Sequence, residues 1–410
     1  MANPLHNKKI LLGVTGSIAC YKAADLASKL SQAEAQVDVI LTGAAEQFLT
    51  TLTFQSVTGR RAYRDADLWG SEGHVLHIEL GKSADLLVIA PASANTLAKL
   101  ANGLADNLLT ITALAAGGRE NPACPLILAP AMDGGMYAHP ATQANLDLLQ
   151  ARGALIVGPA EGHLASGLSG IGRMVEPPEI LGHIRLALAQ NGPLKGRKVV
   201  VTAGGTAEPL DPVRVISNRS SGKQGYALAQ AALDRGARVI LISAPTKLPT
   251  PAGAERVDVE TAEEMCTAVL HALPEADALL MAAAVADFRP VAPSAEKIKR
   301  GKGIPQLTLE AAPDILAAVK EYRAHYGWPR VTVGFAAESQ NLLGNAQAKL
   351  QSKGLDLIVA NDIRATDAGF SVDSNRVTLL DAGGGEAALP LMSKAEVAEA
   401  VLERVEGMLA

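Results

Sequence analysis

A single carboxylate stands where a buried strand ends in the segment APAMDGGMYAHP, residues 129–140. The apolar run PLILAP, residues 125–130, predicts that strand. Asp133 and two glycines then open a loop between Met132 and Met136. Ligands of open α/β sheets bind beyond the carboxyl ends of the strands, so Asp133 is a candidate to face a polar ligand.

A glycine turn, small hydroxyls and a lysine precede a predicted helix in VTAGGTAEPLDPVRVISNRSSGKQG, residues 201–225. Backbone N–H groups at a helix start, together with Ser221 and Lys223, would bind an anionic substrate or nucleotide. The segment is not a Walker A loop, because the glycine required five residues before Gly222 is Ser217. The alternative is a capped helix start with a solvated lysine.

A third polar segment is AAAVADFRPVAPSAEKIKRGKG, residues 282–303, in which Asp287 ends an apolar strand. The cations Lys297, Lys299, Arg300 and Lys302 follow in a loop that contains glycine. Such a cluster can clamp a triphosphate and neutralise its developing charge, and Asp287 beside it would help to hold Mg²⁺. The alternative is a solvated basic turn.

Polar candidates also occur near the N-terminus. GVTGSIACYK, residues 13–22, is a predicted strand–turn–helix whose small residues Gly16 and Ser17 are typical of a phosphate site at a helix start. It lacks GxGxxG and does not indicate a dinucleotide. PASANT, residues 91–96, ends another strand with hydroxyls and an amide. His77 lies at an apolar-alternating position, where a lone histidine is more often packed or solvated than catalytic.

Alternating strands and helices must position these residues. Buried parallel strands are predicted at residues 8–14, 35–42, 84–91, 125–130 and 154–159, with helices at 18–32, 93–101, 103–116 and 139–152. After a helix at 179–190 and the linker signal NGPLKGRK, strands are predicted at 198–205, 237–245, 277–285, 330–338 and 355–362. We therefore predict an α/β protein with two doubly wound, Rossmann-like domains, residues 1–190 and 191–410.

Composition narrows the function classes. A chain of 410 residues suits roughly two or three domains of about 150 residues, and 48% apolar residues argue against disorder. Only 3% aromatic residues and a net charge of −5 argue against nucleic-acid and membrane-surface partners. The start MANPLHNKK lacks a signal-peptide core, and three distant cysteines indicate neither a disulfide framework nor a metal site. We predict a cytoplasmic protein.

The second half carries a family resemblance. DPVRxISNxSSGKxG, AAVADFRP, EKIK, PDIL, GFAAES and LDLIVAND together resemble phosphopantothenate–cysteine ligase over most of residues 195–405. In that family CTP activates the phosphopantothenate carboxylate as an acyl-cytidylate, and cysteine displaces CMP. The resemblance implies that Asn218 binds and polarises the acyl-cytidylate and that Lys297 assists its formation. It implies nucleotide binding by Asp287, Pro313, Asp314, Ile315, Leu316, Phe335, Lys349 and Lys353.

The first half resembles flavin-dependent cysteine decarboxylases in GSIA, HIEL, PASANT and PAMxxxMY. The whole chain is thus similar to the bifunctional bacterial phosphopantothenoylcysteine decarboxylase/phosphopantothenate–cysteine ligases of coenzyme A synthesis. In that family FMN oxidises the substrate thiol, the thioaldehyde loses CO₂, and the enethiol is reduced to phosphopantetheine. His77 aligns with the active-site histidine and Met132 with the substrate loop. Residues Gly16, Ser17, Thr42, Ser93, Asn95 and Thr96 fall at flavin-contacting positions.

Two positions depart from the family pattern. Asp133 replaces the family's Asn, and in ASGLSGIGR Ser166 stands where the proton-donating Cys belongs. Serine is a far weaker acid than cysteine, whose pKa is about 8.5, so Ser166 should protonate the enethiolate poorly. An ionised Asp133 would repel the substrate carboxylate, because both groups are anions. A protonated Asp133 could donate a hydrogen bond, which requires a raised pKa.

Three hypotheses follow. The favoured one is a bifunctional enzyme that uses FMN and Mg²⁺ and takes phosphopantothenate, cysteine and CTP. The second is a ligase whose FMN-binding domain is impaired or redirected by Asp133 and Ser166. The third is a flavoprotein scaffold with both sites silent, against which Asn218, Asp287 and Lys297 argue. The resemblance also implies a homo-oligomer, with trimers of flavin domains and dimers of ligase domains in a dodecamer.

Overall fold

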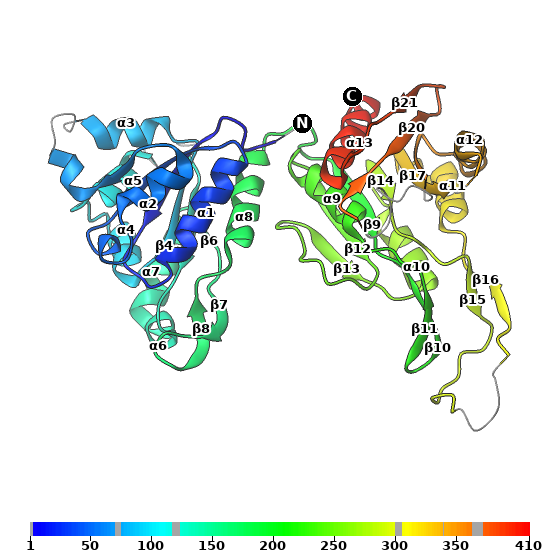
Figure 1. Cartoon of the computed structure of the whole chain (residues 1–410), viewed down its shortest axis with the longest axis horizontal. Coiled ribbons are helices and arrows are strands. Elements are labelled where there is room, and N and C mark those ends of the chain that lie inside the picture. The colour runs from blue at the N-terminus through cyan, green and yellow to red at the C-terminus, as the bar shows by residue number, and fades with distance from the viewer. Residues whose placement is uncertain (1–2, 70–74, 117–123, 300–305, 339, 363–371) are drawn as a thin grey trace. The chain divides into compact units, whose positions relative to one another are not determined.

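The computed structural model describes residues 3–69, 75–116, 124–299, 306–338, 340–362 and 372–410. The chain divides into two compact units, Asn3–Leu188 and Ala189–Ala410, and each is built around its own sheet (Figure 1). Among the described residues, no helix is both long and apolar enough to cross a membrane.

The first unit contains a six-stranded parallel sheet in the order β3-β2-β1-β4-β5-β6. Its strands are β1 (Lys9–Val14), β2 (Gln36–Leu41), β3 (Ala62–Arg64), β4 (Leu86–Ala92), β5 (Leu126–Pro130) and β6 (Leu155–Ile156). Its helices are α1 (Cys20–Gln32), α2 (Thr51–Thr58), α3 (Leu76–Ser83), α4 (Ala94–Asn102), α5 (Leu108–Ala116), α6 (Gly134–Ala138), α7 (Pro140–Ala151) and α8 (Pro177–Ala189). A separate hairpin joins β7 (Ala160–His163) to β8 (Ser169–Arg173).

Helices cover both faces of this sheet, because successive side chains of a strand point in opposite directions. Ile10, Leu12 and Val14 of β1 pack in a core with residues of α1 and α8. Leu11 of the same strand joins a second core, formed with α3, α5 and α7. Burial on both faces explains why the strands read as continuous apolar runs. The chain turns to opposite sides of β1 to form β2 and β4, and this makes a topological switch point between β1 and β4.

The second unit repeats the plan with eight strands in the order β13-β12-β9-β14-β17-β18-β20-β21, in which β20 pairs antiparallel with both of its neighbours, β18 and β21. These strands are β9 (Lys198–Ala203), β12 (Arg238–Ser243), β13 (Glu255–Asp258), β14 (Ala278–Met281), β17 (Val331–Glu338), β18 (Leu357–Asp362), β20 (Val377–Asp381) and β21 (Glu386–Ala388). The helices are α9 (Lys223–Leu233), α10 (Ala262–Ala272), α11 (Ile315–Tyr326), α12 (Leu342–Lys353) and α13 (Lys394–Leu409).

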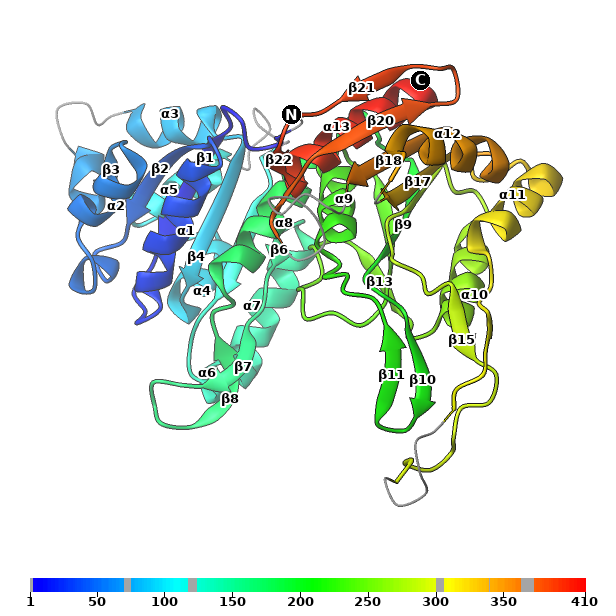
Figure 2. The same cartoon turned by 45° about the vertical axis from the view of Figure 1, so that its right-hand side comes forward.

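Three two-stranded ribbons flank this sheet. They pair β10 (Ala207–Asp211) with β11 (Arg214–Ser217), β15 (Phe288–Pro290) with β16 (Leu309–Ala311), and β19 (Ser374–Asn375) with β22 (Met392–Ser393). Helices α10 and α11 share one core with β12 and β14. Helix α13 lies alongside α9 (Figure 2). The switch point of this sheet falls between β9 and β14.

The parallel sheet of the first unit and the mainly parallel sheet of the second confirm the predicted doubly wound α/β class, while several predicted elements differ. The helix predicted at 103–116 begins only at Leu108, because Gly103 ends α4 with a positive φ of 71°. The strand predicted at 154–159 is shortened to Leu155–Ile156, and Gly158 follows with a φ of 81°. The strand predicted at 277–285 ends at Met281. The hairpin and the ribbons were not predicted.

Candidate active sites

One hydroxyl joins the two strand ends at the switch point of the first unit. Thr15 Oγ1 donates to the Pro91 carbonyl at 2.7 Å and accepts from the Ser93 N–H at 2.9 Å. Thr15 follows β1, and Ser93 follows β4. This arrangement brings the predicted flavin residues Gly16 and Ser17 to the same edge as Ser93. Sequence reasoning did not assign Thr15 a role, although it lies inside the quoted motif.

The remaining predicted flavin residues surround the same edge. Ser93 caps α4 by accepting from the Thr96 N–H at 3.4 Å, and Thr96 is buried while Asn95 is exposed. Thr42 is buried at the end of β2. A Cβ on Gly16 would lie 2.5 Å from the Cβ of Ala44, so a larger residue would not fit there. The edge therefore offers helix N-termini, hydroxyls and a close backbone approach, which suit the phosphate of a flavin nucleotide.

His77 lies in helix α3, not in the apolar alternation that the sequence indicated. Its neighbours Leu76 and Leu80 face the core with the helical spacing of four residues. The Nδ1 atom of His77 is buried and has no hydrogen-bond partner among the described residues. A buried ring nitrogen of this kind requires an explanation, and a bound ligand supplies one.

Asp133 is held as a carboxylate. It caps α6, and its Oδ1 accepts from the Gly135 N–H at 2.9 Å. Its Oδ2 accepts from Ser166 Oγ at 2.7 Å. The Ser166 hydroxyl, followed by the Gly135 N–H, lowers the pKa of Asp133. Both neighbours therefore favour the ionised form of Asp133 over the protonated, donating form.

The β7–β8 hairpin brings Ser166 to Asp133. The Met132 N–H donates to the Gly172 carbonyl at 3.0 Å, which fastens β8 to the loop after β5. A Cβ on Gly172 would lie 2.2 Å from the Met132 carbonyl oxygen. Only glycine allows this contact, so the hairpin and the Asp133 loop form one packed surface.

A buried lysine anchors the end of the hairpin. Lys22 on α1 is 4% exposed, and its Nζ donates to the Met174 carbonyl and to Glu176 Oε1, both at 2.8 Å. A lysine among the apolar positions of α1 is the sequence signal that could have indicated such a partner. The anchor connects β8 to the helix that follows β1.

In the second unit, one cavity of about 680 Å³ gathers nearly all the predicted ligase residues. It lies at the carboxyl edge of the sheet, where the segments after β9 and β14 meet the later residues of β17 and β18. The predicted residues that line it are Asn218, Ser221, Lys223, Asp287, Pro313, Asp314, Ile315, Leu316, Phe335, Lys349 and Lys353. Three lysines in this set, together with Lys394 on the same cavity wall, make the cavity suitable for anionic ligands.

Asn218 is positioned at the switch point between β9 and β14. Its Nδ2 donates to the Ala284 carbonyl at 2.8 Å, and Gly205 forms a parallel bridge with Ala284. Gly222, with a φ of 77°, then starts α9 without a side-chain cap among the described residues. This arrangement leaves the α9 N-terminus directed at the cavity, as expected for an anion site.

Two lysines and one carboxylate form a first cation cluster in the cavity. Lys353 pairs with Asp314, and Lys349 Nζ donates to the Phe335 carbonyl at 3.2 Å. Burial alone would raise the pKa of Asp314, but the hydrogen bonds from Lys353 and the Ala317 N–H outweigh it and lower that pKa. We refer to Lys349, Lys353 and Asp314 as the α12 cluster.

Lys297 is the one predicted ligase residue that the structure does not bring to the cavity. It is exposed in the loop after β15, and it does not line the cavity. Its neighbour Ile298 is fastened to the β10–β11 ribbon, donating its N–H to Asp211 Oδ2 at 3.1 Å and accepting from Arg214 Nη1 at 3.0 Å. Lys299 is exposed in the same loop, whereas Arg300 and Lys302 lie outside the described residues.

Asp287 is an exposed carboxylate on the cavity wall. Within the part of the chain that the structure describes, no group of three or more His, Cys, Asp or Glu residues could hold a metal ion. Mg²⁺ usually binds through one or two carboxylates together with substrate phosphates and waters. One carboxylate beside a phosphate site therefore fits the predicted role of Asp287.

Sequence reasoning assigned no site role to five polar residues that line this cavity, which are Ser220, Gln224, Asn361, Asn375 and Lys394. Gln224 follows Lys223 in a segment that was singled out. Lys394 follows Ser393, whose capping box with Glu396 signals a helix start in the sequence. Nothing local indicates that this helix start reaches a cavity built by residues far earlier in the chain.

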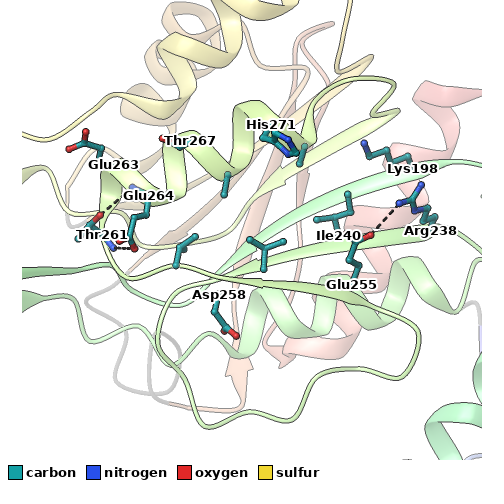
Figure 3. Close-up of a pocket in the computed structure, with 14 residues that line it drawn as sticks. Lys198, Arg238, Ile240, Glu255, Asp258, Thr261, Glu263, Glu264, Thr267 and His271 are labelled. Carbon is teal, nitrogen blue, oxygen red and sulfur yellow. Dashed lines mark hydrogen bonds and ion pairs between the residues drawn. The ribbon is translucent and has the colours of Figure 1, made fainter.

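A second cavity, of about 840 Å³, lies between β12, β13 and α10 (Figure 3). None of the predicted site residues lines it. Its charged groups contact one another, as in the ion pair of Arg238 with Glu255 at 3.2 Å and the capping box of Thr261 with Glu264. We assign it no chemistry.

Comparisons with known proteins cover both units. A family model described as Flavoprotein matches residues 2–188, and one described as DNA/pantothenate metabolism flavoprotein C-terminal domain matches residues 194–408. The chain is 44% identical over 407 residues to the coenzyme A biosynthesis bifunctional protein CoaBC of Bacillus subtilis (strain 168), with 98% of each chain covered.

Two solved structures are similar to single units. The crystal structure of the C-terminal domain of coenzyme A biosynthesis bifunctional protein CoaBC is 38% identical, with a TM-score of 0.45, over 53% of this chain and 98% of that chain. The FMN binding protein AtHal3 is 36% identical, with a TM-score of 0.39, over 44% of this chain and 96% of that chain.

Proposed function

The chain belongs to the family of coenzyme A biosynthesis bifunctional proteins, and we propose how its residues divide the two reactions. It is a bifunctional enzyme with a ligase half and a decarboxylase half, and its N-terminal half is a flavoprotein that uses FMN. Nothing in the comparisons favours the alternative of a ligase alone. The domain division that we propose is residues 1–190 and 191–410.

The ligase assignment rests on the cavity that gathers Asn218, Asp287 and the four lysines. We propose that CTP binds there with Mg²⁺ held by Asp287 and the phosphates. The phosphopantothenate carboxylate attacks the α-phosphorus, and pyrophosphate leaves. The amine of cysteine then attacks the acyl carbon, its proton passes to solvent, and CMP leaves with the C–O bonding pair. This chemistry requires charge neutralisation and orientation and needs no protein nucleophile.

We propose that Asn218 orients the acyl group. Its amide is fixed by the Ala284 carbonyl at the switch point, so its position does not depend on substrate. A fixed amide dipole stabilises charge on the acyl oxygen without reorganisation during the reaction. Lys297 lies on an exposed loop, from which its ammonium group would neutralise charge on the polyphosphate while the acyl-cytidylate forms.

The decarboxylase assignment rests on the edge where β1, β2 and β4 end. Gly16, Ser17, Thr42, Ser93, Asn95 and Thr96 would hold FMN there, and bound FMN supplies the two-electron oxidation and later reduction of the substrate. The buried Nδ1 of His77 would form a hydrogen bond with a bound ligand. Asp133 and Ser166 would contact the substrate together with Met132. Because Asp133 is ionised, it would bind a substrate N–H rather than the substrate carboxylate.

The test uses the full-length protein loaded with FMN, as checked by absorbance. Phosphopantothenoylcysteine is added, and CO₂ and thiol products are followed by mass spectrometry. We expect CO₂ release. Phosphopantetheine as the product would support complete decarboxylase chemistry, whereas an enethiol product would place the loss at Ser166. No CO₂ from flavin-loaded protein would contradict the decarboxylase half, and Asp133→Asn would then be the first variant to test for recovery.

Assembly and location extend the same proposal. We propose a homo-oligomer, with trimers of the flavin units and dimers of the ligase units in a dodecamer, in the cytoplasm. Its ligands are small molecules, with no nucleic-acid or membrane partner. Exposed apolar side chains on the ribbons, such as Val213, Phe288 and Leu309, support contacts through the ligase units.

A further inference from the structure

The ligase cavity contains a second cation cluster, made by the first residues of two helices. Lys223 begins α9, Lys394 begins α13, and both line the cavity. Asp373 connects them, since it accepts from Lys223 Nζ at 2.6 Å through its side chain and from the Lys394 N–H at 2.9 Å through its carbonyl. We refer to Lys223, Lys394 and Asp373 as the α13 cluster.

The two helices pack side by side and start at the same end (Figure 2). Gln224 in the first turn of α9 donates to the Lys394 carbonyl at 3.1 Å, which fixes the two N-termini relative to each other. Both helix dipoles therefore place partial positive charge near the same part of the cavity. The buried Gln224 Oε1 has no hydrogen-bond partner among the described residues.

The electrostatics of Lys394 favour an anionic ligand. Its side chain is 7% exposed, whereas that of Asp373 is 87% exposed. Burial lowers the pKa of Lys394, and the charge of Lys223 lowers it further, against the opposing effect of Asp373. The positive charges of Lys223 and Lys394 thus share one carboxylate, that of the solvent-exposed Asp373. An anion bound between them would offset both the burial and the mutual repulsion of the lysines.

The proposed ligation brings together two reactants that each carry phosphate, a nucleoside triphosphate and a phosphorylated acid. The α12 cluster adjoins Phe335 and Pro313–Leu316, the residues proposed to bind the nucleotide. The α13 cluster comes from different helices. We propose that Lys394, together with Lys223, binds the phosphate monoester of the acid substrate and so fixes the far end of that substrate. This inference rests on the proposed ligase function.

The experiment compares phosphopantothenate with pantothenate, which lacks the phosphate, as ligands of the full-length enzyme. In Lys394→Gln we expect the preference for phosphopantothenate, measured as the ratio of the two Kd values, to fall by about tenfold or more, as for the loss of one charge-assisted hydrogen bond. The Kd for CTP should stay unchanged. Lys195→Gln, an exposed lysine bonded to Asn191, is the matched control and should change none of these values.

Each other outcome is informative. Weaker CTP binding with an unchanged phosphopantothenate preference would assign the cluster to the polyphosphate and overturn the proposal. No change in either ligand would overturn it as well. A wild-type enzyme that bound neither ligand would instead contradict the ligase function itself. If thermal unfolding shows that Lys394→Gln does not fold, Lys223→Gln, which alters the more exposed member of the pair, provides the same comparison.

Discussion

Asp133 and Ser166 change each other's chemistry before any substrate binds. The Ser166 hydroxyl donates a hydrogen bond to the Asp133 carboxylate at 2.7 Å, so its proton is engaged and only the lone pairs of the hydroxyl oxygen are left to meet another group. An alcohol in this position is a poor acid, and the hydrogen bond makes loss of its proton to another group harder still. Two departures that looked independent in the sequence are therefore one structural unit.

At this scale we predict that Ser166→Ala raises the pKa of Asp133 towards the ordinary value of an aspartate. The hydroxyl is the largest cause of the lowered pKa, so its removal leaves only the Gly135 N–H as donor. The measurement is a carboxyl ¹³C titration of Asp133 by NMR. Ser169→Ala in the same hairpin is the control, and an Asp133 pKa that did not move in Ser166→Ala would contradict the assignment.

The same lowered pKa gives the hairpin a pH dependence. Because the pKa of Asp133 is lower in the folded chain than in the unfolded chain, the contact stabilises the fold fully above the unfolded value. That contribution is lost as the pH falls through the folded value. We predict that the protection factors of hairpin amides, which are corrected for the intrinsic exchange rate at each pH, are smaller at acid pH than at neutral pH in the wild type. Ser166→Ala should show a smaller acid effect, and an equal effect in both proteins would be evidence against this linkage.

At the scale of elements, the β7–β8 hairpin depends on one glycine. In Gly172→Ala the new Cβ would meet the Met132 carbonyl oxygen at 2.2 Å, so the hairpin must move away from the loop that carries Asp133. We predict a loss of about 1–3 kcal/mol in the free energy of unfolding, as for other overpacked contacts, together with reduced CO₂ release. Thermal unfolding and product analysis test both effects.

Gly170 provides a matched control on the same strand. A Cβ at Gly170 has nothing within 4 Å, so Gly170→Ala should leave stability and CO₂ release near the wild-type values. Equal losses in the two variants would show that an added methyl group is destabilising at either glycine of β8, and the specific contact with Met132 would then lose its support.

At the scale of the whole molecule, the two sheets share one plan. In each sheet, predicted site residues lie at the topological switch point, which is between β1 and β4 in the first unit and between β9 and β14 in the second. The chain divides into two compact units, and the predicted residues of each site lie within one of them. We predict that Lys297→Gln slows CMP formation from CTP and phosphopantothenate by about tenfold or more, as one lost charged contact would. It should leave CO₂ release from phosphopantothenoylcysteine unchanged. CMP formation at the wild-type rate would remove Lys297 from the mechanism.

The parts of this molecule that the sequence predicted are those with a local signal. β1 and β4 are continuous apolar runs because both of their faces are buried, and the polar residues after them necessarily reach one edge of a parallel sheet. The cavity around Asn218 and Asp287 follows from the same rule. His77 was misplaced because an apolar spacing over a few residues fits a strand and a short helix equally well.

The parts that were missed depend on contacts between distant positions. Ser166 and Asp133 are 33 residues apart, and the Gln224 side chain reaches the Lys394 carbonyl across 170 residues. The β15–β16 ribbon has three residues in each strand, too few for a period-two pattern to emerge. Such contacts arise only after the sheets have formed, so no window of sequence contains them.

The bond between Asp133 and Ser166 also restricts the order in which these positions can change during evolution. A carboxylate at position 133 without a donor at position 166 loses the group that most favours its ionised form. A hydroxyl at position 166 opposite an amide keeps an acceptor, but that acceptor carries no charge. A lineage that moves between the Asn–Cys and Asp–Ser pairs therefore passes through a single mutant with a weaker hydrogen bond, and the two positions should vary together among related chains.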